Sequence, residues 1–122
     1  MSERRQLGDV GEAMALKKLL SDGLVVLDRN VRTPSGEIDI VAREGGDIVF
    51  IEVRTRRGAP GDAAESISKA KLARMWQCSE EYCETNAVDF VTARVDVVTV
   101  DLGIGGRGPF RLEHLRAVEL PG

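Results

Sequence analysis

Two carboxylates on neighbouring strand-like segments are the residues best suited to chemistry in this sequence. Asp39 and Glu52 lie in two β-rich runs, Ile38–Arg43 and Ile48–Arg54, which flank Gly45-Gly46. Glycines at both positions of a two-residue loop predict a tight hairpin, since both can adopt positive φ. With that turn, Asp39 lies directly opposite Glu52, and directly opposed Cβ atoms are about 4.5–5.5 Å apart.

Opposed carboxylates repel each other, and a divalent cation between Asp39 and Glu52 is the sharpest explanation for such a pair. Mg²⁺ takes oxygen ligands and keeps several waters, so two carboxylates suit it. A solvated pair at a strand end is the simpler alternative. The run Ile48–Ile51 is apolar at both parities, which favours a strand covered on both faces. Because unpaired charge in such a place is costly, we expect a metal ion or an arginine partner there.

A third acid, Glu12, falls on a predicted helix from about Arg5 to Ser21. It is either a surface glutamate or an acidic group aimed at the hairpin carboxylates. The residues alone leave both interpretations open.

An arginine cluster, Arg54, Arg56 and Arg57, ends the second run, and the hairpin register places Glu37 opposite Arg54. Guanidinium groups bind phosphate bidentately, so the cluster is a candidate phosphate-contacting patch. The same arginines could instead be solvated, or could neutralise nearby carboxylates.

The elements that position these residues follow from hydrophobic periodicity and turn signals. Asp22-Gly23 ends the first helix, Thr33–Gly36 is a turn before the hairpin, and Asp62 or Ser66 caps a second helix. The further predicted elements are a strand at Leu24–Arg32, the second helix at Ala63–Thr85, a strand at Ala93–Val100, a glycine-rich loop at Leu102–Gly108 and a strand-like tail at Phe110–Leu120. The order α-β-β-β-α-β predicts an α/β fold with a mixed central β-sheet flanked by helices, in a single domain spanning residues 1–122.

Composition narrows the class of protein. The net charge of −3 argues against a protein that coats DNA non-specifically, so any nucleic-acid contact needs a local basic patch. We expect no membrane span and a cytoplasmic location, because neither a spanning apolar run nor a signal-peptide core is present. Cys78 and Cys83 are expected to be reduced, on different sides of a helix, and His114 to be structural. A homodimer is left open.

The chain resembles the YraN family (UPF0102) of bacterial proteins and, more broadly, the PD-(D/E)XK nucleases. The most specific matches are Gly36-Glu37-Ile38-Asp39-Ile40-Val41-Ala42 and Val49-Phe50-Ile51-Glu52-Val53-Arg54-Thr55-Arg56. Further matches are Gly11-Glu12-Ala13, Arg29-Asn30-Val31-Arg32, Ser66-Ile67, Lys71, Arg94-Val95-Asp96-Val97 and Glu113-His114-Leu115-Arg116. The resemblance covers nearly the whole chain and implies a restriction-endonuclease-like fold.

The resemblance also implies roles for individual residues. Asp39 and Glu52 match the two metal-binding acids, and Glu12 matches the first-helix glutamate of the Holliday-junction-resolvase-like branch. Arg54 stands where the motif has a catalytic lysine, and an arginine is effectively never deprotonated. Lys71 or Lys69, on the following helix, is the candidate to replace it.

Two functions are therefore expected from the sequence. The first is a Mg²⁺- or Mn²⁺-dependent nuclease acting on DNA, with Glu12, Asp39, Glu52, Arg54 and Lys71 as catalytic candidates. The second is a non-catalytic nucleic-acid-binding or protein-interaction module that keeps the nuclease fold. In either case, the residues expected to contact nucleic acid are Arg32, Arg56, Arg57 and Lys69.

Overall fold

The computed structural model describes residues 3–103 and 110–119 of the chain. In chain order the elements are α1 (Glu3–Ser21), β1 (Val25–Thr33), β2 (Gly36–Glu44), β3 (Asp47–Arg56), α2 (Asp62–Glu65), α3 (Lys69–Thr85), the 3₁₀ turn η1 (Phe90–Thr92), β4 (Ala93–Asp101) and β5 (Arg111–Leu115). The strands form one sheet in the order β1-β2-β3-β4-β5, in which β3 and β4 are parallel and the other neighbours antiparallel. The predicted α/β fold with a mixed sheet is confirmed.

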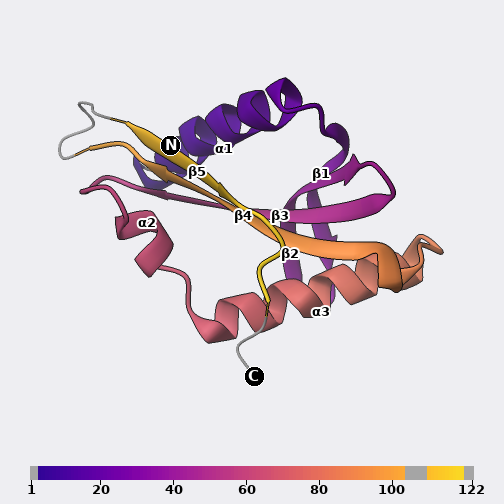
Figure 1. Cartoon of the computed structure of the whole chain (residues 1–122). Helices are drawn as coiled ribbons and strands as arrows, with labels where there is room; N and C mark the ends of the chain where they lie inside the picture. The colour runs from indigo at the N-terminus through magenta and orange to yellow at the C-terminus, as the bar shows by residue number, and fades with distance from the viewer. Residues whose placement is uncertain (1–2, 104–109, 120–122) are drawn as a thin grey trace.

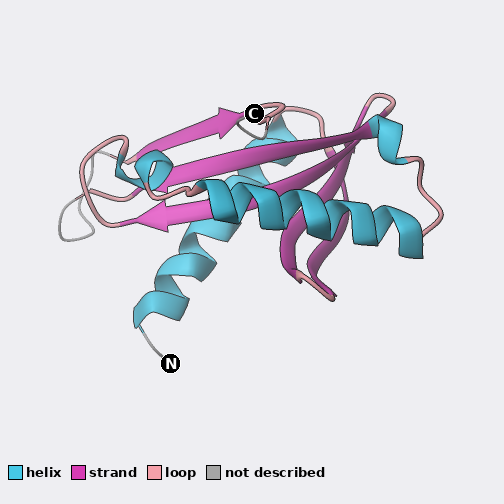
Figure 2. Ribbon diagram, turned by 90° about the horizontal axis from the view of Figure 1, so that it is seen from below, coloured by secondary structure: helices cyan, strands magenta, loops and turns pink. Residues whose placement is uncertain are grey.

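The helices form layers on both faces of the sheet, with α1 on one face and α2 and α3 on the other (Figures 1 and 2). On the α1 face, Ala15 and Leu19 pack against strand residues such as Ile51 and Val98. On the α3 face, a second cluster includes Phe50 and Val97. Successive residues of β3 and β4 thus point to opposite buried faces, which explains why both strands are apolar at both parities.

A buried glycine brings α1 close to the sheet. A Cβ atom built on Gly11 would lie 1.7 Å from Oγ1 of Thr55, in β3. At its other end α1 stops as predicted: Gly23 has φ +90°, and the N–H groups of Gly23 and Leu24 donate to Leu20 and Leu19. These two bonds are the Schellman motif.

The predicted helix Ala63–Thr85 is two helices, which corrects the sequence analysis. α2 ends at Glu65, and Ser68 begins α3 by accepting a hydrogen bond from the Lys71 N–H at 3.0 Å. Neither Asp62 nor Ser66 acts as the cap; the buried Asp101 instead accepts from the Gly61 and Ala63 N–H groups at 3.0 and 2.9 Å. The break matters because it sets the phase at which α3 presents its side chains to the sheet.

Two smaller differences concern the C-terminal tail and α3, and part of one predicted loop is not described. The strand-like tail predicted at Phe110–Leu120 is shorter, since β5 ends at Leu115. Residues 104–109 of the predicted glycine-rich loop lie outside the described residues. Cys78 and Cys83 are both free, but they pack into the same cluster under α3 and not on different sides of it.

Within the described ranges, no helix combines the length and the apolarity needed to cross a bilayer.

Candidate active site

The hairpin turns at Gly45-Gly46 with the predicted register, but its two strands separate before they reach the acids. The pairing between β2 and β3 runs from Glu44–Asp47 to Ile40–Ile51 and ends there. Beyond this point β3 continues alongside β4. Asp39 and Glu52 are therefore the first residues past the paired segment, and a cavity lies beside them on the α3 face.

The cavity has a volume of about 210 Å³ and lies between β2, β3 and α3. It is lined by Ser35, Gly36, Glu37, Asp39, Glu52, Lys71, Arg74, Met75 and Cys78. The α3 residues recur at helical spacing, so one stripe of the helix forms one wall. Asp39, Glu52 and Lys71, all predicted site residues, thus line the same cavity.

Asp39 is held in the cavity by the backbone of the neighbouring strand. Its Oδ2 accepts a hydrogen bond from the Val53 N–H at 2.8 Å. Burial, followed by the charge of the adjoining Glu52 carboxylate, raises the pKa of Asp39 to about 7. Two carboxylates that disfavour simultaneous ionisation are the electrostatic signature of a site prepared for added positive charge.

Lys71 supplies positive charge to this pair. Its Nζ lies 3.2 Å from Oε1 of the buried Glu52, and its charge also acts on Asp39. The Ser68 cap fixes the first turn of α3, which places Lys71 toward the sheet. The helix lysine therefore stands beside the second acid, as one of the sequence hypotheses required.

Arg54, which occupies the position of the motif lysine, is engaged elsewhere. Its guanidinium donates to Oγ and to the carbonyl oxygen of Ser66 at 3.2 and 3.3 Å. Its Nη1 lies 4.0 Å from Glu52, at the limit of an ion pair. The predicted pairing of Glu37 with Arg54 is wrong, because the strands have separated and Arg54 instead turns to the segment between α2 and α3.

Glu12 lies near the acids without joining them. Its carboxylate accepts a hydrogen bond from Arg29 of β1 at 3.3 Å. Burial raises the pKa of Glu12, the Arg29 hydrogen bond opposes this rise, and the negative charge of Asp39 adds to it. Among the described residues no three acidic, histidine or cysteine side chains converge as a metal site, so a ligand role for Glu12 stays a prediction.

None of the residues expected to contact nucleic acid lines this cavity. Arg32 and Lys69 are exposed. Arg56 donates to the Thr55 carbonyl oxygen at 2.8 Å. Arg57 borders a separate, mainly apolar cavity of about 300 Å³ together with residues of α1 and with Phe110. Their contact with nucleic acid stays a prediction.

Sequence reasoning missed three residues that shape the cavity. Arg74 and Met75 follow Lys71 by one helical turn, and this spacing was the available signal. Glu81 lies further along α3, and its carboxylate accepts hydrogen bonds from the N–H and Oγ of Ser35 at 3.0 and 2.6 Å. It thereby fixes the β1–β2 turn to the helix, a long-range contact with no local sequence signal.

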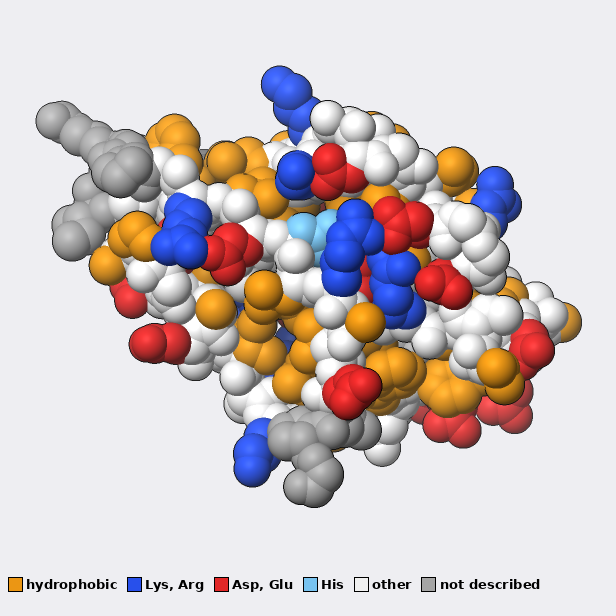
Figure 3. Space-filling model, viewed as in Figure 1, with side chains coloured by type: hydrophobic (Ala, Val, Ile, Leu, Met, Phe, Trp, Pro, Cys, Tyr) orange, Lys and Arg blue, Asp and Glu red, His pale blue; other side chains and the backbone are white. Residues whose placement is uncertain are grey.

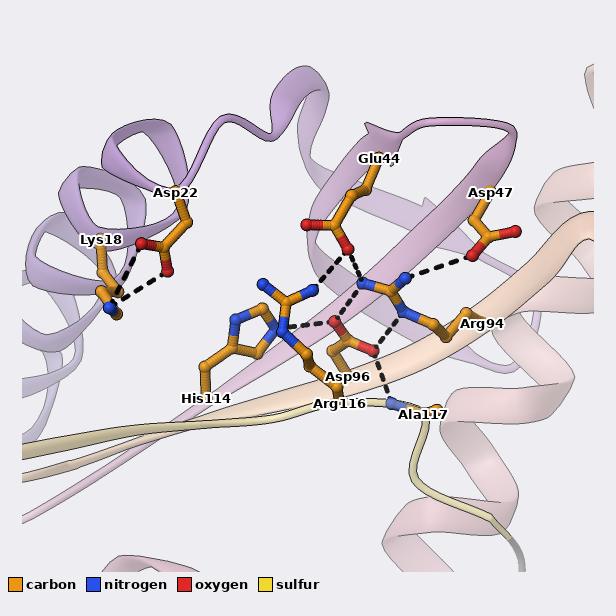
Figure 4. Close-up of polar contacts among 9 residues, drawn as sticks. All are labelled: Lys18, Asp22, Glu44, Asp47, Arg94, Asp96, His114, Arg116 and Ala117. Atoms are coloured by element: carbon orange, nitrogen blue, oxygen red, sulfur yellow. Dashed lines mark hydrogen bonds and ion pairs between the residues drawn. The ribbon is translucent and has the colours of Figure 1, made fainter.

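A second polar network lies on the opposite face of the sheet, near the end of α1 (Figure 4). Asp96 is fully buried and accepts from Arg94, from His114 at 2.7 Å and from the Ala117 N–H. Burial alone would raise the pKa of Asp96, but these hydrogen bonds lower it to about 2. In Figure 3, basic and acidic side chains surround the pale-blue His114, the one histidine of the sequence. The network joins β4 to the chain after β5, which is a structural role.

A helix, an antiparallel three-stranded meander, a helical crossover and a parallel fourth strand define an α/β fold with a mixed sheet, and Asp39 and Glu52 lie where the second and third strands separate. The chain belongs to the uncharacterised protein family UPF0102, whose model matches residues 11–100.

Relatives in this family match most of the chain. A UPF0102 protein of Roseiflexus castenholzii is 46% identical over 114 residues, which cover 92% of this chain and 91% of the relative. One of Paenarthrobacter aurescens is 41% identical over 119 residues, which cover 97% of each chain.

Three solved structures overlap with the fold more weakly. A repair endonuclease from Pyrococcus abyssi has a TM-score of 0.48 and 13% identity, covering 87% of this chain and 41% of its own. SfsA of Pyrococcus furiosus, in complex with Ca²⁺, has a TM-score of 0.44 and 12% identity, covering 95% and 65%. A complex of EndoMS with double-stranded DNA has a TM-score of 0.38 and 19% identity, covering 70% and 34%. TM-scores below 0.5 support no conclusion about function.

Proposed function

We propose that this protein is a Mg²⁺- or Mn²⁺-dependent nuclease that hydrolyses phosphodiester bonds of DNA. The observation that carries the proposal is the adjoining Asp39 and Glu52 carboxylates, with Lys71 at 3.2 Å from Glu52, in a cavity where β2 and β3 separate. The resemblance of the surrounding residues to the PD-(D/E)XK motif supports it.

The donor set fits a hard divalent cation. Mg²⁺ is typically held by one or two carboxylates together with water and substrate phosphate, so a third protein ligand is not required. Asp39 and Glu52 would hold the ion. When bound, the ion would neutralise the scissile phosphate and activate a water molecule. Burial and the charge of Glu52 raise the pKa of Asp39 to about 7. Ionising both carboxylates is therefore unfavourable without a cation between them.

The protein's own residues would then position the substrate and balance its charge. Lys71 would offset the negative charge that develops on the phosphate, since it is the cation nearest Glu52. The Val53 N–H orients the Asp39 carboxylate. Arg54 would act mainly through its charge, because Ser66 already occupies two of its donor groups.

The test is a cleavage assay on branched, flapped and single-stranded DNA with Mn²⁺, Mg²⁺ or EDTA. We expect metal-dependent cleavage by the wild type and a loss of about 100-fold or more in Asp39→Ala. Glu84→Gln, which alters an exposed carboxylate of α3, is the control and should cleave like the wild type. Cleavage that survives Asp39→Ala, or that persists in EDTA, contradicts the proposal. DNA binding without cleavage by any variant would favour the non-catalytic module.

A further inference from the structure

Three cations border the candidate site, and they differ in how much of their bonding capacity is already used. Lys71 forms an ion pair with Glu52, and Arg54 bonds to Ser66. Arg74 lines the cavity beside Asp39 and Glu52, yet none of the carboxylates in the described part of the chain lies within ion-pair distance of it. Its guanidinium therefore remains available to an external anion.

The stem of Arg74 nevertheless packs against the turn between β1 and β2. A Cβ atom on Gly36 would lie 3.3 Å from Arg74 Cδ and 3.5 Å from Cys78 Sγ, so the arginine stem passes directly beside the turn backbone. Glu81 holds this turn against α3 by accepting hydrogen bonds from the N–H and the hydroxyl of Ser35. Because the turn confines the stem, less side-chain entropy is lost when the guanidinium binds a ligand.

We infer that Arg74 is a phosphate-binding residue that positions the DNA backbone next to the scissile phosphate, an inference that rests on the proposed nuclease function. The cavity joins acids that suit a cation to a guanidinium that suits a phosphate. On α3, Lys71 and Arg74 are three positions apart, so they face the same side about one turn from each other. This arrangement lets Lys71 serve the reacting phosphate while Arg74 binds an adjacent phosphate with its bidentate fork.

The experiment measures DNA binding in a background that does not depend on cleavage. Fluorescence anisotropy is recorded for fluorescein-labelled single-stranded DNA of two unrelated sequences, with Asp39→Asn as the common background and over a range of salt concentrations. Adding Arg74→Ala should weaken binding about tenfold for both sequences. It should also reduce the slope of log K against log salt by about 0.7, the share of one phosphate contact with a single strand.

Two further variants separate phosphate binding from a structural role. Arg74→Lys keeps the charge but loses the fork, so it should preserve the salt slope and lose only part of the affinity; it also keeps the test valid if Arg74→Ala does not fold. Lys17→Ala removes an exposed cation of α1 and should change neither quantity. Unchanged affinity and slope in Arg74→Ala overturn the inference, as does an absence of DNA binding in the background protein. If the wild type binds DNA but does not cleave it, the nuclease proposal fails while an altered slope still supports Arg74.

Discussion

At the scale of single residues, the site depends on how Asp39, Glu52 and Lys71 share charge. The fold holds the half-buried Asp39 in place through the Val53 N–H and leaves it beside the buried carboxylate of Glu52. Lys71 compensates for one negative charge at 3.2 Å from Glu52. The pKa of Asp39 nevertheless stays raised, because Asp39 is desolvated and adjoins Glu52, and each residue prediction follows from this arrangement of charge.

The first prediction concerns the stability of the apo protein. Because the folded-state pKa of Asp39 is about 7, above its ordinary value, the protonated form is favoured by folding. This contribution is complete below the ordinary aspartate pKa and is lost as pH rises toward 7. Asp39→Asn should therefore raise the melting temperature by about 3–6 °C at pH 8 and by little at pH 4, as measured by calorimetry in EDTA. A clear drop at pH 8 would mean that Asp39 is instead part of a stabilising ion pair.

The second prediction concerns the metal ion. Isothermal titration with Mn²⁺ should show binding to the wild type and at least about tenfold weaker binding to Asp39→Asn, because the variant lacks an anionic oxygen ligand. Glu84→Gln should bind like the wild type. Equal binding by Asp39→Asn and the wild type would place the ion elsewhere.

The third prediction concerns the catalytic cation. Lys71→Ala should lower metal-dependent cleavage by about 100-fold, because it removes the cation in contact with Glu52. Arg54→Lys should cleave at least as well as the wild type, since it restores the group that the motif normally provides. The opposite result, in which Arg54→Ala is inactive and Lys71→Ala is active, would assign the role of catalytic cation to Arg54.

At the scale of elements, α1 and α3 position the site from opposite faces of the sheet. The contact of Gly11 with Thr55 sets the distance of α1 from β3 and places Glu12 within electrostatic range of Asp39. The cap at Ser68 sets the rotation of α3. Because both contacts are short-range, adding or removing a single group at either one should shift the position of the whole helix.

The fourth prediction tests the α1 contact. Gly11→Ala should destabilise the protein by about 1–3 kcal/mol, since the new methyl would lie 1.7 Å from Thr55 Oγ1. Gly8→Ala is a matched control on the same helix, where a Cβ meets nothing within 4 Å. It should stabilise the protein by about 0.5–1 kcal/mol, because alanine favours a helix more than glycine does. Chemical denaturation measures both changes, and equal effects would exclude close packing at Gly11.

At the scale of the whole molecule, the half-buried Asp39 and the fully buried Asp96 make the stability depend on pH in opposite directions. Asp39 lies by the cavity on the α3 face, and Asp96 lies in the network that joins β4 to the chain after β5. The folded-state pKa of Asp96 is about 2, below its ordinary value, so its contribution is present above the ordinary aspartate pKa and is lost as pH falls toward 2.

The fifth prediction follows from this opposition. The free energy of unfolding should rise from about pH 2 to 4 and decline toward pH 7 in the apo protein. Asp39→Asn should remove part of the decline in stability toward pH 7. It should leave unchanged the rise between about pH 2 and 4, the acid limb of the profile. Asp96→Asn should flatten the acid limb and destabilise the protein by about 3–5 kcal/mol at pH 7, because Arg94 and His114 lose a buried anionic partner. A pH profile of urea denaturation tests both, and an acid limb unaffected by Asp96→Asn would contradict the role given to the network.

The sequence by itself determined the features that depend on local rules. Two β-rich runs and the turn glycines between them predicted the hairpin, its register and the proximity of Asp39 to Glu52, while Asp22-Gly23 predicted the end of α1. Only the tertiary structure decided which cations reach the acids. The strands separate after Ile40–Ile51, so Arg54 turns to Ser66 and not to Glu37, and the break between α2 and α3 brings Lys71 and Arg74 to the cavity. Such choices arise from packing between elements distant in the chain, where long side chains have several partners within reach and no local pattern selects among them.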